Sequence, residues 1–252
     1  MSIALDSAQT FLLLLLRVGT FLMLIPPFGE AQVPSRIRIG LAVMLSACLM
    51  WGAPHSTAGD LPLSGLVGAA VHETLLGLAG GLGASMVFQA AGAAGFLAGT
   101  SMGLGFGAAA AAGVDGAVVS QFMHVLTLSA LVALGAHRQA IAWLYESVRA
   151  FPPGGMSGEV AGGSLELTRL VSSCVGYGLF SMALAVRVVF PVLAASLFGH
   201  AAMGIVSRAA PQINLSSVGF SISILSGGTA LYFAAPMMAN AVAQATMASL
   251  TP

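Results

Sequence analysis

Long uninterrupted apolar runs dominate the pattern of this chain. No charged residue occurs between Thr74 and Val114, and none follows Arg208. These runs lack the two-residue alternation of membrane-spanning strands, and each is near or above the roughly 20 residues that a helix needs to cross a bilayer. The pattern therefore predicts spanning helices. They cover about 8–28, 37–54, 63–90, 91–112, 117–136, 170–199 and 216–247.

Proline and glycine mark the strongest break in this pattern. Pro152-Pro153-Gly154-Gly155 cannot continue a helix, because proline has no amide donor and glycine resists ordering. We expect a polar loop at about 137–168. Its Pro/Gly-rich part, 151–168, divides the predicted N-terminal helical bundle, 1–150, from a C-terminal helical hairpin, 169–252.

The stretch 63–112 can make one membrane pass or two. Two passes would place Arg36 and Arg38 on the same side of the membrane as the arginines around the long loop, as the positive-inside tendency prefers. One pass would separate them. The pattern leaves both topologies open.

Composition strengthens the membrane prediction. Hydrophobic residues make up 58% of the 252 residues and charged residues only 6%, whereas soluble domains carry about 25% charged residues. Eight arginines balance eight acids and lysine is absent, so the chain cannot build the basic surface of a nucleic-acid binder. It is also too apolar to be disordered. We expect an all-α, polytopic helical membrane protein whose first helix, interrupted by Arg17, is not a cleavable signal.

Three charges lie deep inside apolar segments: Arg17, Glu73 and Arg187. An arginine at the centre of a spanning helix costs about 2.5–3.5 kcal/mol on insertion scales. Such residues serve either an ion or proton pathway or a buried ion pair, and one isolated arginine makes a poor relay. We therefore favour a pair between Glu73 and one of the two arginines. The other arginine would need Asp115, backbone carbonyls or a carboxylate from another subunit.

Glycines recur at the spacing of a helix turn. Gly95, Gly99, Gly103 and Gly107 are four residues apart, and Gly77 and Gly81 are paired in the same way. In lipid, small residues one turn apart let helix backbones approach closely. We therefore predict helix packing at Gly77, Gly81, Gly95, Gly99 and Gly103. So much glycine weakens a helix, and the stretch 103–116 is a candidate irregular segment.

Motifs for catalysis are missing from the sequence. His72-Glu73 would need a second histidine at position 76 to bind zinc as a metalloprotease does, and Leu76 stands there. Without lysine there is no phosphate-binding Gly-x-x-x-x-Gly-Lys loop, and there is no Cys-x-x-Cys. We predict no catalytic, cofactor-binding or metal site, and hence no enzyme.

Four motifs in order resemble the FliR/SctT-like family of type III export-gate subunits. They are Arg17 with Pro26-Pro27-Phe28-Gly29 and Val33-Pro34-Ser35-Arg36-Ile37-Arg38; Glu73 with Leu76-Gly77; Gly135-Ala136-His137 with Ser147 and Phe151-Pro152-x-Gly154; and Arg208-Ala-Ala-Pro211-Gln212-Ile213-Asn214 with Gly219-Phe220. Two departures stand out. Asp115-Gly116 replaces the family's Asp-Pro, and Ser223 replaces a lysine after Gly219-Phe220, so a charge contact at that turn is lost.

The resemblance implies a structural subunit of the flagellar protein-export gate. The family assembles with FliP and FliQ, and FlhB joins them, in the bacterial inner membrane within the flagellar basal body. Unfolded flagellar proteins pass through this gate. By resemblance, the N-terminal bundle is FliP-like and the C-terminal hairpin FliQ-like, with contacts to membrane lipid and none to nucleic acid. The family's pore plug would correspond to Leu104, Gly105, Phe106, Gly107, Gly113, Asp115 and Gly116.

Two other functions are compatible with the residues. A virulence-type secretion apparatus uses a similar subunit, although Gly219-Phe220 favours the flagellar one. A small-molecule transporter would use buried charges and broken helices as a binding site. Such a transporter would bind its solute as a single purified chain, whereas a gate subunit would co-purify with two other small hydrophobic proteins.

Overall fold

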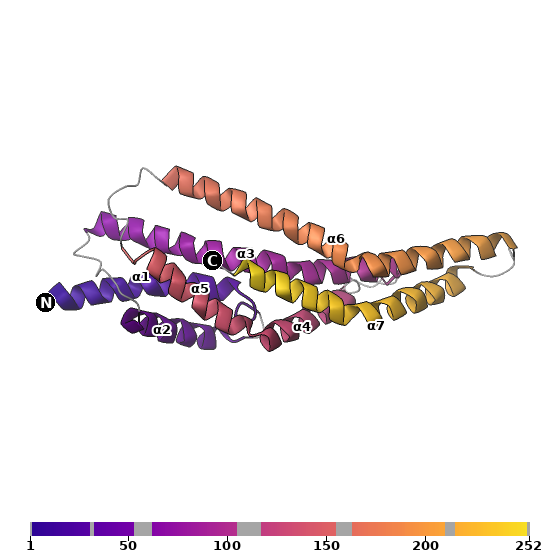
Figure 1. Ribbon diagram of the computed structural model, residues 1–252, viewed down its shortest axis with the longest axis horizontal. Helices are drawn as coiled ribbons and strands as arrows, with labels where there is room; N and C mark the ends of the chain where they lie inside the picture. Colours follow the sequence, from indigo (N-terminus) through magenta and orange to yellow (C-terminus); the bar gives the residue numbers. More distant parts are fainter. Residues whose placement is uncertain are drawn as a thin grey trace. The chain divides into compact units, whose positions relative to one another are not determined.

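The computed structural model describes residues 2–30, 33–52, 62–104, 117–154, 163–209 and 215–250. Throughout these ranges the regular secondary structure is α-helical, which confirms the predicted all-α class. The helices are α1 (Ser2–Leu24), α2 (Ser35–Gly52), α3 (Leu63–Ser101), α4 (Ala117–Leu134), α5 (Ala136–Ala150), α6 (Gly163–Ala209) and α7 (Leu215–Ser249) (Figure 1).

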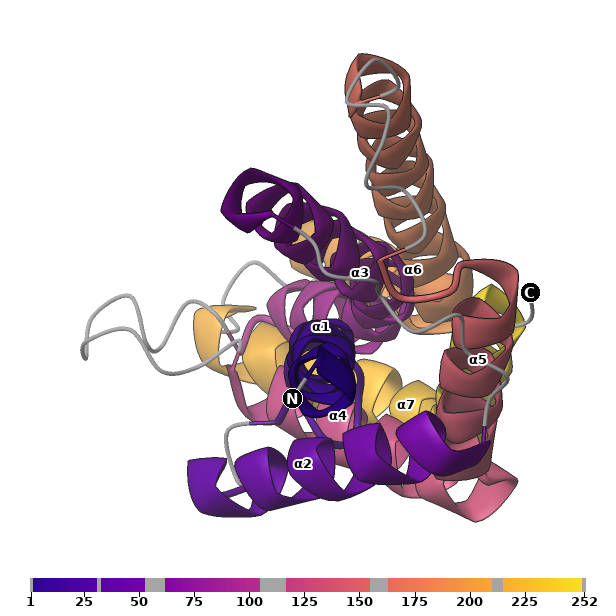
Figure 2. The ribbon, with the colours of Figure 1, turned by 90° about the vertical axis from the view of Figure 1, so that its left-hand side faces the viewer.

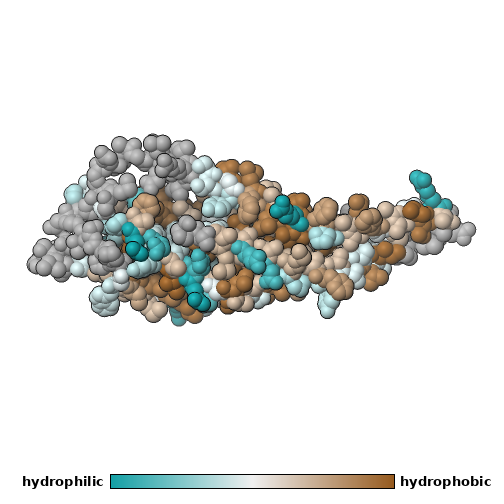
Figure 3. Space-filling view, in the orientation of Figure 1, coloured by the Kyte–Doolittle hydropathy of each residue, from teal (hydrophilic) through white to brown (hydrophobic). Residues whose placement is uncertain are grey.

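Five of these helices are long and apolar enough to cross a membrane: α1, α2, α3, α6 and α7. Together α4 and α5 would make a sixth crossing, bent by 65°. The bend falls at Gly135, whose φ of 83° lies in the left-handed region that glycine adopts without strain. Apolar residues dominate the visible surface and hydrophilic residues are scattered over it (Figure 3), as expected of helices that face lipid or other apolar helices.

The stretch expected as two segments, 63–90 and 91–112, is one continuous helix as far as Ser101. The two-pass alternative needs a turn near residue 90, and α3 has none. The helix ends at Gly103, whose φ is 79°. The Gly103 amide donates to the Thr100 carbonyl at 3.0 Å and the Leu104 amide to the Gly99 carbonyl at 3.1 Å, which is a Schellman cap. Gly103 caps α3, and its predicted role in helix packing stays a prediction.

The prediction of a polar loop at 137–168 was wrong for the first half of this range. Residues Ala136–Ala150 form α5, an amphipathic helix with Ala136, Ala140, Leu144 and Val148 buried. Their four-residue spacing places them on one face, and the polar residues that suggested a loop cover the other. In the second half, residues 155–162 lie outside the described ranges and α6 begins at Gly163. The helix continues to Ala209, beyond the expected end at about 199.

Two compact units make up the chain. The first contains Met1–Met86, Gly135–Gly178 and Thr246–Pro252; the second contains Val87–Leu134 and Leu179–Ala245. Helices α3, α6 and α7 each contribute residues to both units. The division at 151–168 concerns sequence blocks rather than compact units, and it stays a prediction.

The core of the first unit joins four helices and the residue after α7. In this unit α1 lies between α2 and α3 (Figures 1 and 2). Phe21 of α1 stacks on Trp143 of α5, with ring centroids 4.7 Å apart. The buried cluster around them comprises Leu14, Val18, Phe21, Leu22, Ile25, Ala42, Leu49, Ala84, Ala140, Leu144, Val148 and Leu250.

The core of the second unit is made of smaller side chains. Alanine, valine and methionine from α3, α4, α6 and α7 fill it; its members are Ala90, Ala91, Ala94, Ala98, Met102, Val119, Met123, Ala185, Val188, Val189, Val192, Ala235, Met238 and Val242. Gly95 brings α3 close to α4, since a Cβ there would lie 2.7 Å from the Val119 carbonyl oxygen. The Ser120 hydroxyl then donates to the Gly92 carbonyl at 2.9 Å.

Candidate functional site

Arg17 and Glu73 form a buried ion pair in the first unit. Arg17 lies in the middle of α1 and is completely buried, and Glu73 of α3 is 1% exposed. The Arg17 Nε donates to the Glu73 Oε2 at 2.5 Å. Two charges that would each be costly in an apolar interior are therefore compensated by each other.

The remaining nitrogens of Arg17 bind the end of α5. Nη1 donates to the Ser147 carbonyl oxygen at 3.0 Å and lies 3.4 Å from its hydroxyl, and Nη2 donates to the Phe151 carbonyl oxygen at 2.9 Å. The last carbonyls of a helix have no partner within the helix and carry partial negative charge. The Ser147 carbonyl oxygen also accepts the Phe151 amide at 3.0 Å, so Arg17 adds a charged donor at this helix end. It joins α1, α3 and α5 at one point.

Glycines on α3 make this approach possible. Gly77 lies one turn after Glu73, and a Cβ there would overlap the Thr20 hydroxyl and the Arg17 carbonyl of α1. One turn further, a Cβ at Gly81 would lie 2.8 Å from the Leu24 Cβ. Both glycines thus face α1, and the backbones of the two helices come close enough for Arg17 to reach Glu73 without a long side-chain extension.

On the next face of α3, Gly80 accommodates Trp143. A Cβ at position 80 would overlap the indole ring, which stacks on Phe21 of α1. The aromatic stack closes one side of the helix junction with apolar surface. Arg17 and Glu73 are both buried, and exclusion of water strengthens their electrostatic attraction.

The predicted site residues fall into three groups. Arg17, Glu73, Gly77 and Gly81 come together in the first unit. In the second unit Gly95 contacts α4, Gly99 is buried, and Arg187 is exposed on α6. Of the residues predicted as a pore plug, the described ranges contain Leu104 alone, half-buried after the Gly103 cap. The others lie outside these ranges: Gly105, Phe106, Gly107, Gly113, Asp115 and Gly116.

Two partners of Arg17 were missed as site residues. Ser147 and Phe151 act mainly through their backbone carbonyls, which leave no trace in residue type. The one available signal was the motif stretch that contains both residues and ends at Gly154, where φ is 76°. A left-handed glycine there turns the chain immediately after α5.

The geometry indicates a structural junction rather than a reaction centre. All three nitrogen atoms of the Arg17 guanidinium have acceptors within the chain, and Arg17 cannot lose its proton at any accessible pH. Within the described ranges, no group of three or more His, Cys, Asp or Glu residues is arranged to hold a metal ion. A fixed cation with satisfied donors holds helices in place.

The sequence matches the family described as bacterial export proteins, family 1, over residues 8–249. The chain belongs to this family. Family membership confirms the resemblance drawn from the four motifs, and three of those motifs contribute residues to the Arg17 junction.

Individual relatives align with this chain along most of their length. The flagellar biosynthetic protein FliR of Escherichia coli is 28% identical over 229 residues, covering 89% of this chain and 84% of the relative. The protein of the same name from Caulobacter vibrioides is 28% identical over 217 residues, covering 84% and 82%. That of Bacillus subtilis is 26% identical over 232 residues, covering 89% and 85%.

Proposed function

We propose that this export-family protein is a structural subunit of the flagellar protein-export gate. The observation that carries the proposal is the family match across residues 8–249, together with relatives named as flagellar biosynthetic proteins. The Arg17 junction supports a structural role, because it fixes three helices and leaves no arginine donor nitrogen free for chemistry.

We further propose that the chain assembles with FliP, FliQ and FlhB in the bacterial inner membrane, and that unfolded flagellar proteins pass through the assembly. The exposed apolar surface of α6 and α7 supports partners of this kind. Only 22% of the spanning window of α6 and 28% of that of α7 are buried within the chain, compared with 44% for α3. Large exposed side chains on these two helices include Leu179, Met182, Phe190, Leu197, Phe198, Tyr232, Phe233 and Met237.

The role of Arg17 in this assembly is to hold α1, α3 and α5 in one arrangement. Its contacts to Ser147 and Phe151 span about half of the chain length, so they define the relative positions of helices that are distant in sequence. A subunit that packs against several neighbours benefits from a rigid internal junction, because its outer faces are then ordered before assembly.

We also propose that residues 104–116 close the pore of the resting gate. The segment is rich in glycine and alanine and carries one charge, Asp115. Side chains this small would offer little packing to break in a movement that opens the pore. Deleting Gly107–Gly113 should leave the complex assembled but leaky to small ions. Dye or ion flux into proteoliposomes measures this, and a deleted gate as tight as the intact one would contradict the plug.

Deletion of the gene in its own bacterium tests the main proposal. We expect loss of motility and of secreted hook and filament proteins, with recovery when the intact gene is returned. A tagged chain should co-purify with two other small hydrophobic membrane proteins. Normal flagella in the deletion strain would overturn the flagellar proposal, and loss of secreted virulence proteins in their place would assign the chain to the virulence-type apparatus.

A further inference from the structure

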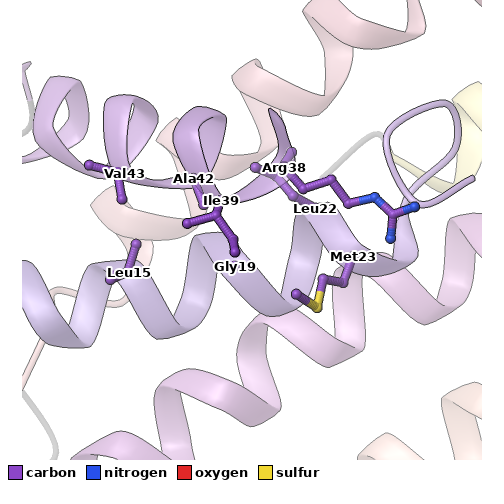
Figure 4. A pocket seen from close by; sticks show the side chains of 8 residues that line it. All are labelled: Leu15, Gly19, Leu22, Met23, Arg38, Ile39, Ala42 and Val43. Carbon is purple, nitrogen blue, oxygen red and sulfur yellow. The ribbon is translucent and has the colours of Figure 1, made fainter. Parts of the chain in front are cut away.

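A groove of about 190 Å³ lies between α1 and α2 in the first unit (Figure 4). Glycine leaves its floor open, since no heavy atom lies within 4 Å of the position of a Cβ at Gly19. Apart from one arginine, the groove is lined by apolar residues and this glycine. The lining residues are Leu15, Gly19, Leu22, Met23, Arg38, Ile39, Ala42 and Val43.

Arg38 lies at one end of this groove, away from Leu15 and Val43 (Figure 4). Its Nη2 donates to the Glu30 carbonyl oxygen. Its Nε is buried and has no acceptor in the described part of the chain. The Nε is enclosed by the chain, but Arg38 as a residue is only half-buried, so its positive charge can be approached from outside the chain.

The polar end of the groove coincides with the helix ends. Arg38 and the exposed Arg36 lie in the first turn of α2, and Met23 lies at the end of α1. Both helices are candidate membrane spans. The arginine end therefore falls at the membrane surface, and Leu15 and Val43 lie deeper in the hydrocarbon region.

We propose that this groove binds an anionic phospholipid, with one acyl chain along the apolar lining and the phosphate at Arg38. A phosphate at this end of the groove meets the positive charge of the half-buried Arg38 side chain, and the attached chain fills the apolar groove. Neither feature alone specifies this ligand. Basic residues at the membrane end of a cleft between spanning helices are the usual recognition element for acidic headgroups.

Native mass spectrometry of the full-length chain in mild detergent tests the proposal. The chain is offered palmitoyl-oleoyl phosphatidylglycerol or palmitoyl-oleoyl phosphatidylcholine, which share acyl chains and differ in net charge. We expect roughly fivefold greater retention of phosphatidylglycerol, the ratio that one basic residue near an anionic headgroup provides. Arg38→Gln should abolish this preference and leave weak binding of both lipids.

Variants of the groove separate the acyl-chain site from the charge. Gly19→Leu should reduce retention of both lipids, because its side chain enters the groove. Gly40→Leu is the matched control, since Gly40 of α2 also has open space around a Cβ and does not line the groove. Val43→Gln is a second groove variant, and it should weaken both lipids without adding bulk.

Four outcomes would overturn the proposal. Equal retention of the two lipids by the unaltered chain would show that the site has no preference for an anionic headgroup. Unchanged binding by both Gly19→Leu and Val43→Gln would show that the lipid does not bind in the groove. Complete displacement of phosphatidylglycerol by millimolar inorganic phosphate would make the site one for free phosphate. Loss of lipid binding in Gly40→Leu, whose glycine does not line the groove, would also overturn it.

Discussion

The first compact unit is organised around an ion pair and an aromatic stack, whereas the second is organised around alanine, glycine and serine. In the first unit, the single side chain of Arg17 connects α1 both to Glu73 of α3 and to the end of α5. In the second, the described contacts between helices include Gly95 against the α4 backbone and the Ser120 hydroxyl bound to the Gly92 carbonyl. One junction is a single strong point, and the other is spread over many weak contacts.

The contrast reflects two ways to join helices where lipid removes the hydrophobic driving force between them. Close backbone packing collects many small dispersion contacts and some hydroxyl hydrogen bonds. A buried ion pair instead concentrates the interaction, and the loss of one partner leaves an uncompensated charge. We therefore expect single substitutions to have large effects at Arg17 and Glu73 and graded effects in the second unit.

The largest effect should come from Glu73→Gln. This change keeps the shape of the side chain but strands the Arg17 charge, which cannot be neutralised by losing a proton. We expect a loss of about 3–5 kcal/mol in the free energy of unfolding. Thermal unfolding of the detergent-solubilised chain, followed by size-exclusion chromatography, measures it, and the recovered yield of the assembled complex should fall in parallel.

Two further variants check that prediction. Arg187→Gln removes an exposed arginine from the second unit and should change stability little. The double variant Arg17→Leu with Glu73→Leu should lose less than the two single changes added together, because no charge is left stranded. Full stability in Glu73→Gln would show that the carbonyls of Ser147 and Phe151 suffice for Arg17.

The next largest effects concern the glycines at close helix contacts, which both units share. Gly77→Ala should push α1 away from α3, and Gly95→Ala should push α4 away from α3. We expect each to lose about 1–3 kcal/mol of stability, the usual penalty for overpacking. The measurement is the shift in unfolding midpoint for each purified variant.

Open glycines in each unit provide the matched controls for these changes. Gly68 of α3 and Gly228 of α7 have no heavy atom within 4 Å of a Cβ. Alanine there should be neutral or stabilising, because it favours the helix over glycine by about 1 kcal/mol. If Gly77→Ala behaved like Gly68→Ala, the approach of α1 to α3 would not depend on glycine.

A smaller effect is expected at the cap of α3 in the second unit. Gly103→Ala places a side chain in the left-handed region, where φ is 79°, at a cost of about 1–2 kcal/mol. Gly103→Asn should lose less, since asparagine adopts this conformation more readily. Equal losses for alanine and asparagine would point to a role in packing against Phe220 rather than in backbone conformation.

The smallest effect should come from Ser120→Ala, which removes one hydrogen bond between α4 and α3. Hydrogen bonds between helices in membranes average about 0.6 kcal/mol. Ser129→Ala on the same helix is the control, because the Ser129 hydroxyl bonds the Leu126 carbonyl of its own helix. A loss at Ser120 as large as that of Glu73→Gln would abolish the contrast between the two units.

Local pattern predicted some elements correctly and misjudged others. The apolar runs identified the spanning helices, because a bilayer requires long apolar segments with internally satisfied backbones. The arginines and acids of α5 suggested a loop, although its buried residues already had helical spacing. For α3, glycine content alone could not decide between a break and a continuous helix, because the contacts of Gly77 and Gly95 with other helices decide it.

The sequence by itself determined the class of protein, the family and the deep charges that required compensation, since each depends on residue type and on order along the chain. Only the tertiary structure decided that Glu73 pairs with Arg17 and which other groups accept hydrogen bonds from Arg17. Ser147 and Phe151 reach Arg17 through backbone carbonyls, which every residue carries. A carbonyl becomes a partner through its position at the end of α5, and that position arises from packing between helices more than a hundred residues apart in the chain.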